Sequence, residues 1–346
     1  MKKVTLAIIL LTLISTFSFA QREPQVYIVG TNINDAAYWR NNRGFIFERG
    51  AEANAIAISG SDVYIAGSVR SRNGIDPVYW QHSVGVDRLE NGKCIILPKR
   101  NNNACGYSIA ISGSFVYVAG KDGNDAVYWR NSMRYVLPKE SQSAVAEAIF
   151  IAGSNIYIAG KDGNDAVYWL NDRRFVLPKE GRFAVASGVA IFGTDVYIVG
   201  TDILGEGYSP FGDAVYWLNG KRIALPKTGM SAYATAIAVS GSNVYITGRD
   251  YRTLGHDPAS DAVYWHNGRY IKLSSNNFHN RSGANTIVIS GFDIYIAGFS
   301  DSYTIDDAGN IIDYAGSGAV YWLDGRQYIL PKVSNYADAK GIIVIR

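Results

Sequence analysis

The chain contains seven Trp residues, and each of them directly follows a Tyr. The pairs end at Trp39, Trp80, Trp129, Trp169, Trp217, Trp265 and Trp322, so neighbouring copies are 40 to 57 residues apart. A repeat of this length is typical of the four-stranded blades of a β-propeller and is longer than a leucine-rich or ankyrin repeat. The Tyr-Trp pairs therefore predict a ring of seven blades.

Each repeat divides into four short runs with the composition of β-strands. An Ala-rich run such as 55–60 comes first, and a Val-Tyr-x-x-Gly run such as 63–67 follows it. A run ending in Tyr-Trp, such as 125–129, comes third, and a run ending in Leu-Pro-Lys, such as 136–139, comes last. Short β-branched and aromatic runs separated by Gly, Asn and Asp predict strands. We expect an all-β, seven-bladed β-propeller of four-stranded blades, with the small residues of the first run at its crowded centre.

The two ends of the chain predict how the ring closes. The first repeat begins at Val26 with the motif of a second strand, whereas the segment 339–345, after the last repeat, has the pattern of a first strand. A C-terminal strand that joins the N-terminal blade would cover edges that are otherwise prone to aggregation. Residues 21–346 are thus predicted to form one propeller domain.

Residues 1–20 have the pattern of a secretory signal peptide. Lys2 and Lys3 precede an apolar stretch from Val4 to Ile14, and a run of small and aromatic residues ends at Ala20. This pattern predicts cleavage after Ala20, and the apolar stretch is shorter than the roughly 20 residues that cross a bilayer. We expect an exported protein, located in the periplasm, at the cell surface or outside the cell, with no stable membrane insertion after cleavage.

The charge balance and the absence of known motifs exclude several functions. Lys and Arg number 33 against 30 Asp and Glu, and nucleic-acid binding needs clustered cations, so we expect no nucleic-acid partner. The sequence contains no Walker loop, zinc-ligand spacing or Ser-His-Asp order. We therefore predict no cofactor, no metal and no catalytic residue, and we favour a protein that is not an enzyme.

The repeats resemble a known group of proteins. Units that combine a Val-Tyr-x-x-Gly strand, an Ala-Val-Tyr-Trp-x-Asn-Gly strand and a Leu-Pro end resemble the secreted bacterial β-propeller repeat proteins. The resemblance covers residues 21–346 and implies the propeller fold. No activity is attached to that repeat pattern, so the resemblance implies no catalytic residue. The Gly-His and Trp-Asp pairs of WD40 blades and the double Gly of kelch blades are absent.

Six Asp residues lie three positions before a Tyr-Trp pair, and Gly318 takes the seventh position. A group repeated in every blade favours a structural role, in which each carboxylate accepts backbone N–H bonds and closes the turn between the second and third strands. The alternative is a ring of carboxylates that binds a cation. The Asp-Gly-Asn-Asp turns at 122–125 and 162–165 lack the late Glu of a calcium loop, so we expect no calcium site there. The six residues are Asp35, Asp76, Asp125, Asp165, Asp213 and Asp261.

The two cysteines lie outside the repeated positions. Cys94 and Cys105 belong to neighbouring repeats, and disulfides persist in exported proteins. A bridge requires Cα atoms within roughly 7 Å of each other, and the sequence leaves open whether the two thiols are linked.

Loop lengths point to one face of the ring as the binding site. The step from the second-strand Gly to the third-strand Asp is five residues in blades three and four and thirteen in blades five and six, and it is twenty to Gly318 in blade seven. These loops share a face with the connections between blades, because successive strands alternate in direction. The residues predicted to bind a ligand on this face are Tyr208, Tyr233, Tyr251, Tyr303, Tyr314, Tyr336, His256 and His279.

Exposed aromatic rings between Asn, Asp and Arg suit sugar rings or a partner protein. We therefore expect a binding module for an extracellular glycan or protein ligand on the long-loop face of blades five to seven. Two alternatives stay open: a carbohydrate-active lyase or hydrolase that uses His256 and His279 on the same face, and a purely structural envelope protein. For the tyrosines themselves, the alternative to ligand binding is that they only pack the long loops.

Overall fold

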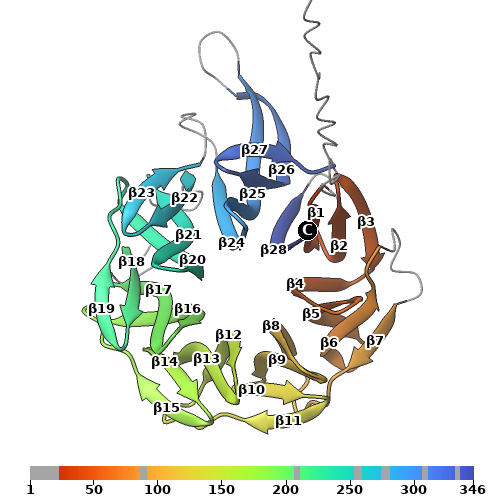
Figure 1. Cartoon of the computed structure of the whole chain (residues 1–346), viewed down its shortest axis with the longest axis vertical. Helices are drawn as coiled ribbons and strands as arrows, with labels where there is room; N and C mark the ends of the chain where they lie inside the picture. The colour runs from red at the N-terminus through yellow and green to blue at the C-terminus, as the bar shows by residue number, and fades with distance from the viewer. Residues whose placement is uncertain are drawn as a thin grey trace, which may run out of the picture.

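The protein is a ring of seven four-stranded antiparallel sheets, as the sequence predicts (Figure 1). This computed structural model describes residues 23–85, 92–205, 211–252, 259–273, 281–305, 311–331 and 336–346, with the backbone alone for 302–305 and 311–315. The predicted signal peptide, residues 1–20, lies outside the described residues. None of the residues within these ranges forms a helix, and hence none provides an apolar helix that could span a membrane.

Blades are numbered by the order of their Trp residues, and strands within a blade are counted from the axis of the ring outward. The inner strands are β28 (Ala337–Ile345), β4 (Ala51–Ser59), β8 (Ala104–Ser112), β12 (Ala144–Ala152), β16 (Phe183–Phe192), β20 (Ser231–Ser240) and β24 (Ser282–Ser290). The second strands are β1 (Gln25–Asn32), β5 (Asp62–Ser71), β9 (Phe115–Asp122), β13 (Asn155–Asp162), β17 (Asp195–Ile203), β21 (Asn243–Tyr251) and β25 (Asp293–Ile305).

The third strands carry the Tyr-Trp pairs, and the fourth strands form the outer wall of the ring (Figure 1). The third strands are β2 (Asp35–Arg40), β6 (Gly74–Ser83), β10 (Asp125–Arg130), β14 (Asp165–Leu170), β18 (Gly212–Leu218), β22 (Ser260–His266) and β26 (Ile311–Leu323). The outer strands are β3 (Arg43–Glu48), β7 (Lys93–Ile96), β11 (Met133–Val136), β15 (Arg173–Val176), β19 (Lys221–Ala224), β23 (Arg269–Lys272) and β27 (Arg326–Ile329).

The C-terminal strand closes the ring, which confirms the prediction from the chain ends. β28 pairs antiparallel with β1, and Val344 lies opposite Val26. The indole N–H of Trp39 donates to the carbonyl oxygen of Pro331 at 3.1 Å, which links blade one to blade seven. The first and last repeats are therefore joined both by a sheet and by a junction between blades.

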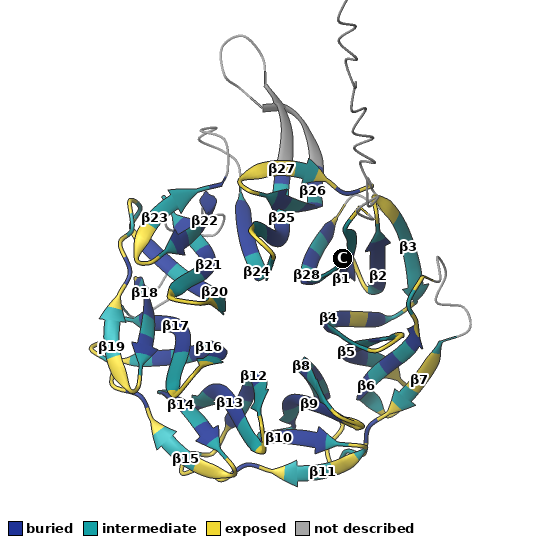
Figure 2. Cartoon of the chain, viewed as in Figure 1, coloured by how far each residue is buried: buried dark blue, intermediate teal, exposed yellow. Residues whose placement is uncertain are grey.

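The Trp side chains hold neighbouring blades together. The bands of buried residues in Figure 2 lie along the inner and middle strands, and six of the seven Trp residues are at most 1% exposed. In blade four the Trp169 indole donates to the carbonyl oxygen of Pro138 in blade three at 2.8 Å. Leu137, beside that Pro, is buried. The Leu-Pro ends of blades two, three, four, five and seven thus each supply an apolar contact and a hydrogen-bond acceptor to the next blade.

The repeated third-strand Asp residues form ion pairs, which differs from the backbone bonds that we expected. Asp125 pairs with Lys139 at 2.8 Å and Asp165 with Lys179 at 2.7 Å, and each Lys follows the Leu-Pro pair of the same blade. Asp35 is an exception, because it accepts the backbone N–H of Gly50. The prediction that these carboxylates accept backbone N–H bonds was wrong, because they form ion pairs with the lysine of the Leu-Pro-Lys segment.

The backbone-capping role belongs instead to the Asp at the end of the second strand. Asp162 is 2% exposed and accepts the N–H groups of Glu140 and Ser141 from the preceding connection between blades. It also pairs with Arg174 of its own outer strand at 2.7 Å. Equivalent carboxylates lie at Asp122, Asp202 and Asp250.

Every inner strand has a β-bulge at the same height. In blade four the pairing shifts between Ala146 and Ala148, which leaves Glu147 as the extra residue. Gly160 lies opposite the bulge, where a Cβ atom would be 3.0 Å from the carbonyl carbon of Val145. The seven bulged residues, here called the axial belt, are all polar: Asn54, Tyr107, Glu147, Ser187, Thr235, Asn285 and Lys340.

The structure also shows which connections share a face. Ser317 in β26 forms a parallel bridge with Tyr336, which precedes β28, and Ser260 in β22 forms the same bridge with Arg281, which precedes β24. The connections between second and third strands therefore lie beside the connections between blades, as the alternation of strands predicts. In blade seven the predicted long loop is largely a hairpin, because β25 and β26 stay paired as far as Ile305 and Ile311.

Candidate functional site

The structure places only some of the predicted site residues. Tyr233, Tyr251 and Tyr336 lie where blades six, seven and one meet. Tyr303 and Tyr314 lie opposite each other in the β25–β26 hairpin, and their side chains are not described. Tyr208, His256 and His279 lie outside the described residues. The predicted group is thus represented by three described tyrosine side chains.

A cavity of about 170 Å³ opens beside two of these tyrosines. It lies on the face of the second-to-third strand connections, between blades six, seven and one. Tyr233 does not line the cavity, but its ring packs edge to face against that of Tyr251, with the ring centroids 5.2 Å apart. The lining residues are Arg249, Tyr251, Ser260, Arg281, Phe299, Ser317, Tyr336 and Asp338.

Arg249 is the central cation of this cavity. Its guanidinium lies 4.6 Å from the centroid of the Phe299 ring, which is a cation–π arrangement. An Nη atom of Arg249 donates to Oδ1 of Asn285 at 2.9 Å, and Asn285 in turn donates to Asp338 at 2.6 Å. No ion pair between Arg249 and another described residue fixes its charge. The guanidinium is therefore oriented by a ring and an amide, and it interacts with the Asp338 carboxyl without a direct ion pair.

A glycine in the inner strand of blade seven makes room for this arrangement. A Cβ atom on Gly283 would lie 2.6 Å from Cε1 of Phe299 and 2.9 Å from Cδ of Arg249. The equivalent inner-strand position in blade four is Val145. A side chain at residue 283 would therefore displace the stacked pair.

The other wall of the cavity combines a paired arginine with serine hydroxyls. Arg281 forms an ion pair with Asp301 at 2.9 Å, and the Ser260 hydroxyl donates to the carbonyl oxygen of Ser282. Ser317 is 2% exposed, and its Oγ atom has no hydrogen-bond partner among the described residues. A buried hydroxyl without a partner costs free energy, so a ligand or a bound water is expected to complete it.

Two ionisable groups at the cavity have shifted pKa values. Burial raises the pKa of the Asp338 carboxyl, and the nearby Arg249 and Lys340 offset this only in part. Burial also raises the pKa of Tyr336, and the charge of Asp338 adds to the effect. Tyr336 is 47% exposed, so only the shift at Asp338 indicates a carboxyl shielded from water, where electrostatic contacts are stronger than at an open surface.

Together these groups have the chemistry of a binding site. Arginine and a serine hydroxyl bind carboxylate, sulfate or phosphate oxygens, and the rings of Phe299, Tyr251 and Tyr336 offer apolar contact. Within the described ranges, no group of three or more His, Cys, Asp or Glu side chains is placed to hold a metal ion.

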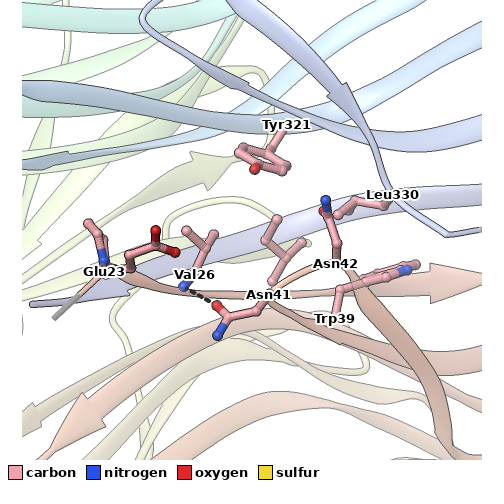
Figure 3. Close-up of a pocket in the computed structure, with 9 residues that line it drawn as sticks. Glu23, Val26, Trp39, Asn41, Asn42, Tyr321 and Leu330 are labelled. Carbon is pink, nitrogen blue, oxygen red and sulfur yellow. Dashed lines mark hydrogen bonds between the residues drawn. The ribbon is translucent and has the colours of Figure 1, made fainter.

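Two larger cavities lack such a combination of groups. One, of about 230 Å³, lies at the seam where the ring closes, and Figure 3 shows Val26, Trp39 and Leu330 around it. Its polar contacts belong to the fold, such as the bond from the Val26 N–H to Asn41. The other, of about 310 Å³, lies between the C-terminal ends of inner strands on the opposite face, and its lining side chains are apolar except for that of Ser240.

The two cysteines and the two described histidines lie away from the cavity between blades six, seven and one. Cys94 and Cys105 are unlinked, and burial raises the pKa of both thiols. Burial lowers the pKa of His82, which meets Tyr38 edge to face. His266 stacks on Tyr245 with the centroids 4.4 Å apart. None of the four lines the cavity at blades six, seven and one.

The sequence prediction missed Arg249, Phe299 and Asp338. A signal for Arg249 was present, because it follows the second-strand Gly at the position that carries Lys121 and Lys161 in blades three and four. Phe299 occupies the same position in blade seven. Comparing the residue that follows the second-strand Gly in all seven repeats would have identified Arg249 and Phe299.

Comparisons with known proteins yield distant structural likenesses and no family. No protein-family model and no curated protein matches the sequence. Among solved structures, the chain resembles the computationally designed Ika8 protein, at 13% identity and a TM-score of 0.43, over 89% of this chain and 96% of that chain. It also resembles the β-propeller domain of the Trilobed protease from Pyrococcus furiosus, at 12% identity and a TM-score of 0.47, over 82% of this chain and 84% of that chain. Pyrococcus horikoshii acylaminoacyl peptidase shows the same identity and TM-score over 82% of this chain, and the match spans 46% of that chain.

Proposed function

We propose that this protein is an exported propeller that binds a ligand carrying an acidic group and a flat apolar face. The ligand occupies the cavity between blades six, seven and one. The observation that carries the proposal is Arg249, a guanidinium held against Phe299 with no ion pair to another described residue. An extracellular glycan with acidic substituents fits this chemistry, and an acidic segment of a protein ligand is the alternative.

Burial explains why such an arrangement favours a ligand. Electrostatic contacts are stronger where water is partly excluded, and Arg249 interacts with the Asp338 carboxyl but forms no direct ion pair with a described residue. An acidic ligand group beside Arg249 would form such a direct ion pair, and the Ser317 hydroxyl would gain a partner. The pattern of residues 1–20 supports a role outside the cytoplasm, where such glycans occur.

The first experiment measures binding to an array of oligosaccharides that contains uronate, sulfated and neutral members. The protein is expected to bind acidic members, and Arg249→Met is expected to weaken binding at least ten-fold in titration calorimetry. Arg130→Met is the matched control, because Arg130 also lies over an aromatic ring, that of Phe115, far from the cavity. Equal affinities of the wild type and Arg249→Met would contradict the proposed site.

A second pair of variants guards against loss of folding. Gly283→Ala is expected to displace the Arg249–Phe299 stack and to weaken binding. Gly318→Ala is the control, since the nearest atom to a Cβ there is the Ser300 carbonyl oxygen at 3.8 Å. Melting temperatures of all variants are measured in parallel. Binding that survives in Gly283→Ala with an unchanged affinity would count against the stack as the anchor.

Asp338 supports a carbohydrate-active enzyme as the second candidate. A carboxyl with a raised pKa beside a ligand cavity has the property of a general acid. The acidic glycans that bind are incubated with the protein, and their products are analysed by mass spectrometry. Turnover that Asp338→Asn abolishes would favour the enzyme, whereas intact glycans would favour the binding module.

A further inference from the structure

The axial belt is hydrogen-bonded over only part of the ring. Asn54 donates to the carbonyl oxygen of Gly106 at 3.0 Å, Thr235 to that of Ala284 at 2.7 Å, and Asn285 to that of Ala339 at 2.9 Å. In each case the acceptor precedes the bulged residue of the next blade. Lys340 continues the series by donating to Oδ1 of Asn54 at 3.1 Å. Blades six, seven, one, two and three are thereby linked around the axis.

The series is interrupted in blades three, four and five. The bulged residues there are Tyr107, Glu147 and Ser187, and none of them donates a hydrogen bond to the next inner strand within the described chain. Asn or Thr at these positions would have the reach to continue the belt, as they do elsewhere. Tyr107 and Glu147 are instead long side chains beside the axis.

Two lysines lie in the interrupted part of the ring, at the second-strand position that Arg249 occupies in blade six. Lys121 lies opposite Cys105 in blade three, Lys161 opposite Val145 in blade four, and Arg249 opposite Tyr233 in blade six. All three cations directly follow the second-strand Gly. No ion pair between Lys121 or Lys161 and another described residue is formed. Blades three and four, which carry these two ammonium groups, thus lie across the axis of the ring from the cavity (Figure 1).

Glu147 lies between these lysines at a cost to the fold. Burial raises its pKa, and Lys161 and Lys121 offset the effect only in part. Tyr107 and Glu147 are the bulged residues of neighbouring inner strands, and burial raises the pKa of the Tyr107 phenol, to which the Glu147 charge adds. A half-buried carboxylate without a hydrogen-bond donor is unfavourable, and an Asn would have avoided it. The Glu147 carboxylate could therefore accept a hydrogen bond from a donor group of a bound ligand.

We propose that Tyr107, Lys121, Glu147 and Lys161 form a second subsite for the same ligand, and that this ligand is a chain of acidic sugars reaching across the axis of the ring. The inference rests on the proposed function, because the cavity with Arg249 is the first subsite. Uronate carboxylates bind the lysines, and sugar hydroxyls donate to Glu147. A run of acidic side chains would offer acceptors only, and Glu147 would repel it.

The experiment compares short and long acidic sugars as probes. Glucuronate and the hexasaccharides of galacturonate, mannuronate and hyaluronan are titrated into the full-length protein and its variants. The double variant Lys121→Met/Lys161→Met is expected to weaken hexasaccharide binding at least ten-fold and to leave glucuronate binding unchanged. Lys93→Met/Lys221→Met is the matched control, because it removes the same charge from exposed positions on the outer strands. If the Met variant melts early, Lys121→Gln/Lys161→Gln replaces it.

The outcomes separate this inference from the proposed function. Hexasaccharide affinity that the Lys121/Lys161 variants leave unchanged but Arg249→Met lowers would overturn the second subsite and retain the cavity. Binding of none of the four probes would overturn the acidic-sugar assignment. Affinity that Arg249→Met does not change would instead contradict the cavity itself. Tighter binding of poly-glutamate than of every hexasaccharide would assign the subsite to an acidic peptide and overturn the assignment to sugars.

Discussion

Blades three to five and blades six and seven share one strand plan, but they complete their buried Asp residues differently. In blades three to five the partner is an arginine of the same outer strand, as in the pairs of Asp162 with Arg174 and of Asp202 with Arg222. In blade six Tyr270 takes the arginine's position and donates its hydroxyl to Asp250. In blade seven Asp301 pairs with Arg281, which lies in the connection between blades six and seven.

The difference distinguishes scaffold from site. Contacts that recur in blade after blade, such as the ion pair of Lys139 with Asp125, hold the sheets in register. Where blades six and seven abandon the recurring contact, cationic groups appear at the cavity in its place. In a repeat protein, exchange of a repeated polar residue therefore marks the candidate site more clearly than the repeated residue does.

The largest expected effect tests the two ways of completing a buried carboxylate. Asp162→Ala leaves the Arg174 guanidinium, 11% exposed, with the exposed Glu140 carboxylate as its remaining ion-pair partner among the described residues, and removal of one member of a buried ion pair costs about 3–5 kcal/mol. Asp250→Ala strands only neutral donors from Thr228, Gly229 and Tyr270, at about 1–3 kcal/mol. Urea unfolding measures both. A loss for Asp250→Ala equal to or greater than that for Asp162→Ala would show that the arginine adds nothing.

A smaller effect is expected at the junctions between blades. Trp169 and Trp322 are both fully buried. The Trp169 indole donates to Pro138, whereas that of Trp322 has no partner among the described residues. Replacement by Phe removes a similar volume at each site, so Trp169→Phe is expected to cost about 1 kcal/mol more than Trp322→Phe. Thermal unfolding of the two variants measures the difference, and equal midpoints would contradict a role for the indole–carbonyl bond.

The smallest expected effect has the opposite sign. Because the pKa of Glu147 is raised in the folded state, its contribution is most favourable below the unfolded pKa of about 4.3 and declines as the pH rises. Glu147→Gln is therefore expected to stabilise the protein at pH 7 by about 1 kcal/mol, the low end of the cost of an unpaired buried group. The gain should vanish below about pH 4.

Asp162 provides the internal contrast for that experiment. Burial alone would raise its pKa, but the N–H groups of Glu140 and Ser141, the Ser141 hydroxyl and Arg174 outweigh burial and lower the pKa. Its contribution to stability is present above the unfolded pKa of about 3.9 and is lost as the pH falls. Unfolding midpoints measured from pH 4 to pH 8 should thus respond in opposite directions to Glu147→Gln and Asp162→Asn. A destabilised Glu147→Gln at pH 7 would show that the carboxylate supports the fold.

The sequence was sufficient for the ring because the information is repeated. Trp129 and Trp169 occur at equivalent positions in successive repeats, and the pattern of 339–345 revealed the closing strand. The loop-length argument pointed to Tyr251 and Tyr336, which line the candidate cavity. It did not find Asp338, because the approach of that residue to Arg249 depends on the order of blades around the circle and on a bulge that leaves no signal in composition.

The closing strand has a consequence for how the protein is made. Trp39 and Pro331, which meet at the seam, are 292 residues apart in the chain, and contacts between such distant segments form slowly. During synthesis β28 leaves the ribosome after all the other strands of the ring, so blade one has an open edge until β28 emerges. A nascent chain of this kind needs protection from neighbouring copies until that strand pairs.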